Sequence, residues 1–251
     1  MSGHNKWSSI KHKKGAADAK RGKLFTKLQR EIMVAAKASG GDPDINAALR
    51  AAIGRAREAN MPKTNIESAI KKGTGELPGV TYEEKVFEGY GPGGVAMLVK
   101  TLTDNGNRTT AEVRNIFSKK NGNMAGPGAV AWQFEARGVI EISAEKASED
   151  DVFMVATDAG ADDIKSSGAM IEVVSDPKDL ENVKKALADA GIQWESADLT
   201  MIAKETVKVE GSAAKQVLGL MEALEDHDDV QNVYANFDIP DEELERLAAE
   251  S

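Results

Sequence analysis

The hydrophobic positions near the N-terminus recur with the period of a helix. Between residues 16 and 39, Leu24, Leu28 and Ile32 lie four apart, so they share one side of a helix. Gly40-Gly41 follows at once, and glycine commonly ends a helix. This pattern predicts a long first helix whose apolar stripe packs inward while its polar side faces solvent.

Two more helices are predicted before residue 80. Leu49 and Ile53 would form the inward side of one, and Ile66 and Ile70 that of the other. Thr64 and Glu67 have the spacing of a capping box, which gives the third helix a second possible start. The two helices are expected from Asp42-Pro43 toward Asn60, and from Pro62 or Thr64 to Gly73, with Pro78-Gly79 as a linker.

After the linker, short apolar runs alternate with helical segments, which is typical of an α+β protein. Strands are expected at Val86–Tyr90, Val95–Thr103, Ala129–Glu135, Val139–Ser143, Asp162–Lys165, Met170–Ser175, near Trp194 and at Val230–Phe237. Helices are expected at Asn107–Lys120, Ser148–Ala159, Pro177–Ala190 and Ala213–Leu224. The order between residues 138 and 205 is βαββαβ, the ferredoxin-like unit.

This order predicts three domains: an N-terminal helical domain and two ferredoxin-like α/β domains, one inserted in the other. Residues 80–136 supply only ββαβ, and residues 207–240 supply the αβ pair that would complete the same sheet. The predicted boundaries are 1–79 for the helical domain, 80–136 with 207–240 for the discontinuous domain, 137–206 for the inserted domain and 241–251 for a C-terminal acidic helix.

Composition narrows the class of protein. The 251 residues contain no cysteine, which excludes disulfides, thiolate metal sites and cysteine nucleophiles. No apolar run approaches the roughly 18 to 20 residues that span a bilayer, and the N-terminus lacks the apolar stretch of a signal peptide. We therefore expect a cytoplasmic protein without a membrane partner. The sequence does not determine the oligomeric state, for which a monomer is favoured.

The charge is divided unevenly along the chain. The whole chain has a net charge of −9, but residues 1–80 hold 16 Lys+Arg against 7 Asp+Glu, a net +9. The other 171 residues, which we call the acidic body, carry a net −18, and residues 1–80 are called the basic head. Two explanations stay open: the basic head binds phosphates, or a basic segment docks on the protein's own acidic body.

The first helix has a basic side as well as an apolar one. Lys20, Lys23, Lys27 and Arg30 recur every three or four residues, so they share one face about 140° from the apolar stripe. Lysine neutralises phosphates without reading sequence. Trp7 would either stack on a base or anchor the preceding arm in a core. The candidate nucleic-acid contacts are Lys6, Trp7, Lys11, His12, Lys13, Lys14, Lys20, Arg21, Lys23, Lys27, Arg30, Arg50 and Arg57.

The chain offers little for catalysis. It contains no phosphate-binding P-loop, zinc-protease or serine-hydrolase motif. Gly89–Gly94 matches a dinucleotide loop in spacing, but a strand follows it, so a hairpin turn is expected. His227 lies in an acidic segment and is expected to be solvated, since nothing marks a metal site. We expect no enzyme activity, no catalytic or metal-ligating residues and no cofactor.

The N-terminal motifs resemble those of the YebC/PmpR family, and the resemblance extends over most of the chain. The N-terminal motifs are Gly3-His-Asn-Lys-Trp-Ser8, Lys11-His-Lys-Lys14, Asp18-Ala-Lys-Arg-Gly-Lys-Leu-Phe-Thr-Lys27 and Arg30-Glu-Ile32. Later ones are Asn60-Met-Pro62, Ile70-Lys-Lys-Gly73, Gly89-Tyr-Gly-Pro-Gly-Gly94, Thr103-Asp-Asn105, Asn107-Arg108, Gly122-Asn123 and Trp132-Gln-Phe134. The resemblance implies three domains and a transcriptional regulator that binds promoter DNA. Other proteins related to this family act instead on translating ribosomes or messenger RNA, so the resemblance also allows a role in translation.

Three functions remain as hypotheses. The first is a transcriptional regulator that binds DNA through the basic head. The second is a ribosome-associated translation factor that binds ribosomal or messenger RNA by shape and phosphate contacts. The third is a protein-interaction module whose basic head meets an acidic partner. The sequence shows no helix with Asn, Gln and Arg grouped for reading base edges, so it does not decide between DNA and RNA.

Overall fold

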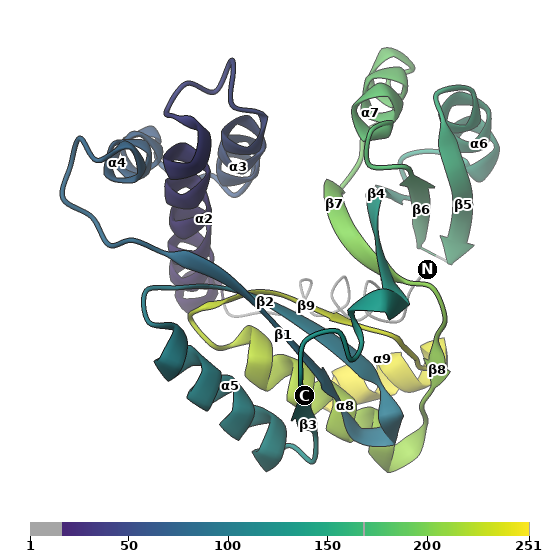
Figure 1. Ribbon diagram of the computed structural model, residues 1–251. Coiled ribbons are helices and arrows are strands. Elements are labelled where there is room, and N and C mark those ends of the chain that lie inside the picture. The colour runs from purple at the N-terminus through teal and green to yellow at the C-terminus, as the bar shows by residue number, and fades with distance from the viewer. Residues whose placement is uncertain (1–16, 168, 251) are drawn as a thin grey trace.

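The computed structural model describes residues 17–167 and 169–250 (Figure 1). The helices are α2 (Ala17–Ser39), α3 (Ala47–Glu58), α4 (Lys63–Thr74), α5 (Gly106–Lys119), α6 (Glu149–Asp158), α7 (Leu180–Asp189), α8 (Gly211–Glu225) and α9 (Asp241–Glu250). The strands are β1 (Glu83–Tyr90), β2 (Ala96–Thr103), β3 (Asn123–Ala125), β4 (Phe134–Ser143), β5 (Ala161–Ser167), β6 (Met170–Ser175), β7 (Ser196–Ala203), β8 (Val207–Lys208), β9 (Val230–Ala235) and β10 (Phe237–Asp238). The α+β class predicted from the sequence is confirmed.

Helices α2, α3 and α4 pack around their own apolar core. Ile32 and Leu49 are fully buried there, as the spacing predicts. Asn46 caps α3: its side-chain oxygen accepts the N–H of Leu49, and its amide donates to the carbonyls of Ala35 in α2 and of Gly40 just after it. Leu24 is 45% exposed, so the prediction that it packs inward is wrong and the buried stripe starts at Leu28.

The third helix begins at Lys63, directly after Pro62. Thr64 therefore lies inside α4, and the alternative start with a capping box at Thr64 is wrong. Proline suits this boundary because it has no N–H to leave unpaired in the first turn. Gly75, in the left-handed conformation with φ 83°, ends the helix two residues beyond the predicted Gly73.

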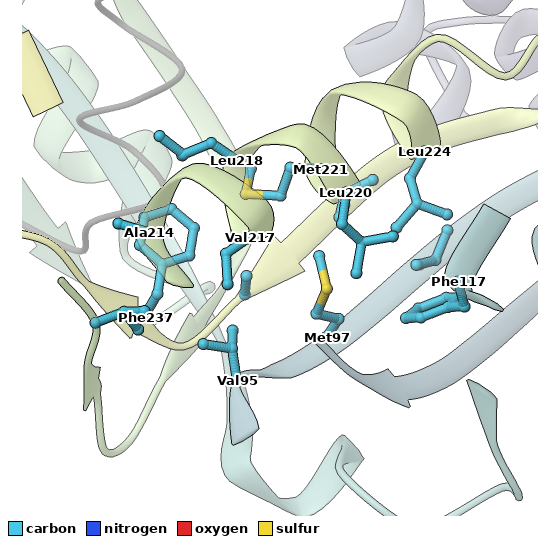
Figure 2. Packing of buried hydrophobic residues seen from close by; sticks show 14 of the residues in the cluster. Val95, Met97, Phe117, Ala214, Val217, Leu218, Leu220, Met221, Leu224 and Phe237 are labelled. Carbon is cyan, nitrogen blue, oxygen red and sulfur yellow. The ribbon is translucent and has the colours of Figure 1, made fainter. Parts of the chain in front are cut away.

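Strands β1 and β2 form the predicted hairpin, and Gly93 and Gly94 adopt positive φ in its turn. Strand β9 pairs antiparallel with β2, which gives the sheet order β3-β1-β2-β9. The last part of the chain, residues 230–235, thus completes a sheet that begins at residue 83. Helices α5 and α8 cover one face of this sheet, where Met97, Phe117 and Leu220 are buried without residual exposure (Figure 2).

The strand predicted at Ala129–Glu135 is wrong. Residues 126–133 form a loop that contains a short 3-10 turn, and the new strand β4 begins at Phe134. The physical reason lies in Glu88 of β1. Its buried carboxylate accepts N–H groups from Gly128, Val130 and Ala131, which a strand would have used in its ladder. The edge of the sheet is supplied instead by β3, which pairs with β1.

Strands β4 to β7 and helices α6 and α7 form the inserted part. Their chain order is βαββαβ and their sheet order is β5-β6-β4-β7, with antiparallel neighbours throughout. This is the ferredoxin-like arrangement that the sequence predicts. Val152, Ile171 and Val183 lie in its own buried core.

Figure 1 shows the head and the inserted part on one side of the β3-β1-β2-β9 sheet, and α5, α8 and α9 on the other side. A small apolar cluster joins the sheet to the inserted part: Leu98 and Tyr234 pack there with Val130 and Phe134. Within the described ranges, no helix combines the length and apolarity needed to cross a bilayer.

Candidate nucleic-acid interface

The predicted contact residues fall into three groups. Arg21, Arg50 and Arg57 are exposed on the head. Lys20 lies in α2, and three further residues of the same helix, Lys23, Lys27 and Arg30, touch the acidic body. The predicted contacts Lys6, Trp7, Lys11, His12, Lys13 and Lys14 lie outside the described residues.

Two lysines of α2 meet the C-terminal end of α8. The Lys27 ammonium donates to the carbonyl oxygen of Glu225 at 2.9 Å, and the Lys23 ammonium donates to that of Asp226 at 3.2 Å. Lys23 also lies 3.6 Å from the Asp226 carboxylate. The last carbonyls of a helix lack partners within the helix and carry partial negative charge, so lysine is well suited to cap them.

Arg30 is a largely buried cation of this face. Its guanidinium donates to the Asp229 carboxylate at 2.9 Å and to the Asp228 carbonyl, and it lies over the Tyr82 ring. Only 15% of its side chain is exposed. The prediction that the basic stripe faces solvent is therefore wrong for Arg30. It is also wrong for Lys27, whose pKa is lowered by burial despite the opposing effect of Glu225.

Asp229 connects the head to the hairpin and to α5. It is 2% exposed, and its second oxygen accepts from the Arg108 guanidinium and from the Thr109 hydroxyl, both at 2.7 Å. Burial would raise the pKa of this carboxyl, but the hydrogen bonds from Thr109 and Arg108 outweigh it and the pKa falls. The sequence analysis does not name Asp229 among the candidate site residues, so this role is found only in the structure.

One sequence signal pointed to this network. Arg108 lies in the first turn of α5, behind the N-cap Asn105. A cation is disfavoured there because the N-terminal end of a helix is electrically positive. An arginine at such a position indicates a specific carboxylate partner nearby, and Asp104 and Asp229 provide it.

Glu112, His227 and Asp229 are the one group in the described ranges whose side chains lie close enough to share a metal ion. The geometry favours an ion-pair network instead. His227 Nε2 lies 2.9 Å from a Glu112 oxygen, and its Nδ1 accepts the N–H of Asp229. Both Asp229 oxygens bind guanidinium groups, whose positive charge opposes a cation. The expectation that His227 is simply solvated is wrong, since only 12% of its side chain is exposed.

A second polar contact joins the head to the inserted part. Arg55 of α3 pairs with Glu31 of α2 and lies 3.5 Å from the Asp198 carboxylate of β7. Burial would lower the pKa of this guanidinium, but Glu31 and Asp198 together outweigh it and raise the pKa. Arg55 therefore positions the head, whereas the other arginines of α3 face outward.

Some cations of the head are exposed and take no part in the contacts with the acidic body, so they are available to a binding partner. Arg50 donates to the carbonyls of Pro43 and Asp44 and stays exposed. In the described part of the head, five exposed cations take part in no ion pair with a described residue and donate to no described carbonyl: Arg21, Lys37, Arg57, Lys71 and Lys72. Arginine presents a planar fork that matches phosphate oxygens, so Arg21, Arg50 and Arg57 suit phosphate contact.

Comparisons with known proteins cover nearly the whole chain. Residues 5–76 match the family model described as the TACO1/YebC protein N-terminal domain, and residues 82–237 match that of the TACO1/YebC second and third domain. The division between the two matches lies at the linker after α4.

Relatives and one solved structure agree with this match. A protein of Geobacter sulfurreducens named "probable transcriptional regulatory protein" is 58% identical over 98% of this chain and its own full length. A protein of the same name from Dictyoglomus turgidum is 55% identical over 99% of this chain and its full length. The crystal structure of a conserved hypothetical protein from Aquifex aeolicus has a TM-score of 0.84 and 47% identity, and covers 92% of this chain and 96% of its own.

Proposed function

The chain belongs to the TACO1/YebC family, and from this premise we propose that it is a non-enzymatic regulator of gene expression that binds DNA through its basic head. The names of the relatives support transcription as the process. The observation that carries the proposal is the separation of charge, a net +9 in residues 1–80 against −18 in the rest. A polyanion binds where positive charge is concentrated and exposed.

The exposed arginines of the head are the proposed contacts that the structure describes. Arg21, Arg50 and Arg57 face outward, and the predicted contacts of residues 6–14 precede them in the chain. Such cations fix the register of a protein on a nucleic acid without reading its bases. The proposal therefore expects strong, weakly sequence-specific binding by the head alone.

RNA is the second candidate, and one observation favours it. No helix of the described head groups Asn, Gln and Arg for reading the major groove. Recognition by shape and phosphate contacts needs no such group and suits structured RNA, including that of the ribosome. In this version the same exposed cations would contact an RNA backbone.

A charge-matched pair of variants tests the head as the binding element. We expect Arg21→Gln/Arg50→Gln/Arg57→Gln to weaken binding to a DNA duplex or a structured RNA hairpin by about tenfold or more. Each phosphate contact releases counterions and so favours binding, and the variant makes fewer such contacts. The control, Arg114→Gln/Lys119→Gln/Lys120→Gln in and directly after α5, removes the same charge from exposed positions of the body. Affinity is measured at several salt concentrations.

The preferred nucleic acid decides between the two candidates. Tighter binding of the duplex supports the transcriptional proposal, and tighter binding of the hairpin supports the RNA version. Equal affinities of the head variant, the control and the parent, or affinities that do not change with salt, would show that the head is not a phosphate-binding element.

A further inference from the structure

The contact between α2 and the acidic body has the chemistry of phosphate binding. Lys23, Lys27 and Arg30 lie on one face of α2 and donate to oxygen atoms of the turn at residues 225–229. This turn, which we call the acidic turn, offers carbonyl oxygens at the end of α8 and the carboxylates of Asp226 and Asp229. These cations belong to the stripe that the sequence predicts for nucleic-acid contact.

Polar contacts, and not a shared core, hold the head in this position. The buried apolar residues of the head form one cluster, which includes Ile32 and Leu49, and those around α5 and α8 form another. The connecting residues 75–81 are exposed. Without a continuous apolar core, the docked position depends on charge and hydrogen bonding, which salt and competing anions weaken.

The docked state also carries a cost. The Nε atom of Arg30 is buried without a hydrogen-bond partner among the described residues. An unpaired buried donor is unfavourable, and the desolvation of Lys27 adds to it. Release of α2 would return both groups to water or to another anion.

We propose that the acidic turn 225–229 mimics a phosphate backbone and competes with nucleic acid for Lys23, Lys27 and Arg30. The inference rests on the proposed function and adds an internal competitor to it. The basic face of α2 then has two alternative occupants, the turn in the free protein and phosphates in the complex. Binding through this face requires the head to leave the end of α8.

Two charge-matched variants test the competition. Asp226→Asn/Asp228→Asn weakens the acidic turn at exposed side chains and leaves buried Asp229 in place. Asp158→Asn/Asp189→Asn removes the same charge at the C-terminal ends of α6 and α7, away from the head. We expect the first variant to bind a short mixed-sequence DNA duplex and an RNA hairpin several-fold more tightly than the second. An equal increase in affinity in both variants would show that net charge alone causes the effect, and would overturn the proposal.

The absence of native cysteine allows the movement to be followed directly. Spin labels at Ala48→Cys on α3 and Ser118→Cys on α5, both exposed, report the distance between head and body. We expect one narrow distance distribution at low salt, and a longer or broader one with saturating DNA or RNA. An Asp226→Asn/Asp228→Asn background should show part of this change without any ligand.

The outcomes separate the two proposals. If nucleic acid binds and the distance between the two spin labels stays unchanged, the proposal that the acidic turn competes with nucleic acid is wrong and the proposed function stands. If neither the duplex nor the hairpin binds at low salt, the proposed function fails and the competition fails with it. If an acidic protein partner shifts the distance but nucleic acid does not, the basic face serves protein binding instead.

Discussion

A single buried acid, Glu88, determines the conformation of the loop between β3 and β4. The residue is 7% exposed, and its carboxylate accepts three backbone N–H groups at 2.7 to 2.8 Å. The Tyr90 hydroxyl donates to the Ala129 carbonyl of the same loop. Burial would raise the pKa of the Glu88 carboxyl, but the three N–H donors outweigh it and lower the pKa. The loop therefore depends on this acid being ionised.

Acid should loosen this loop. Because the pKa of Glu88 is lower in the folded protein than in the unfolded chain, its contribution is fully present above about pH 4.5 and is lost as the pH falls through the folded pKa. The protection factors for amide hydrogen exchange at Gly128, Val130 and Ala131, each taken against the intrinsic rate at the same pH, should fall in that window. Glu88→Gln should cost about 1–3 kcal/mol at neutral pH and remove this part of the pH dependence. Unchanged protection factors at low pH would contradict the role of Glu88.

At the scale of elements, the contact between α2 and α4 depends on a glycine. A Cβ atom at Gly73 would lie 2.5 Å from the Met33 carbonyl oxygen and 2.8 Å from the Ala36 side chain. The two helices can approach only because this side chain is missing. Gly54, in the middle of α3, has open space around it.

The two glycines should respond in opposite directions to the same substitution. We expect Gly73→Ala to lower the free energy of unfolding by about 1–3 kcal/mol through overpacking. Gly54→Ala should raise it by about 0.5–1 kcal/mol, because alanine favours the helix and meets no neighbour. Denaturant unfolding of both variants measures the difference. A neutral Gly73→Ala would mean that α2 and α4 separate at little cost.

Most elements could be predicted because their burial is periodic along the chain. The hairpin, the ferredoxin-like insert and α8 are such cases. The loop at residues 126–133 could not, since Ala129 to Phe134 has the composition of a strand and Glu88 has the pattern of a surface residue. In the candidate site, spacing placed Lys27 and Arg30 on one face of α2. What that face meets is fixed by the acidic turn, almost two hundred residues later.

At the scale of the whole molecule, the separate cores predict that the body folds without the head. A fragment of residues 81–251 should unfold cooperatively, since its two sheets keep their buried clusters. Asp229 would lose Arg30 and keep Arg108 and Thr109, a loss of about 1–2 kcal/mol. At about 2–4 °C per kcal/mol for a fragment of this size, Tm should fall by a few degrees. Circular dichroism checks this, and a fragment without a cooperative transition would show that the head is part of one folding unit.

The pairing of β2 with β9 has a consequence for folding during synthesis. Strand β2 leaves the ribosome early, but its neighbour β9 is made only after the whole inserted part. The head and the insert can each fold as soon as they emerge, since their contacts are local in sequence. The central sheet must wait with the β2 edge open. The residues that close it directly follow the acidic turn, so the last strand of the sheet and the docking surface for the head arrive together, only after the whole inserted part has been made.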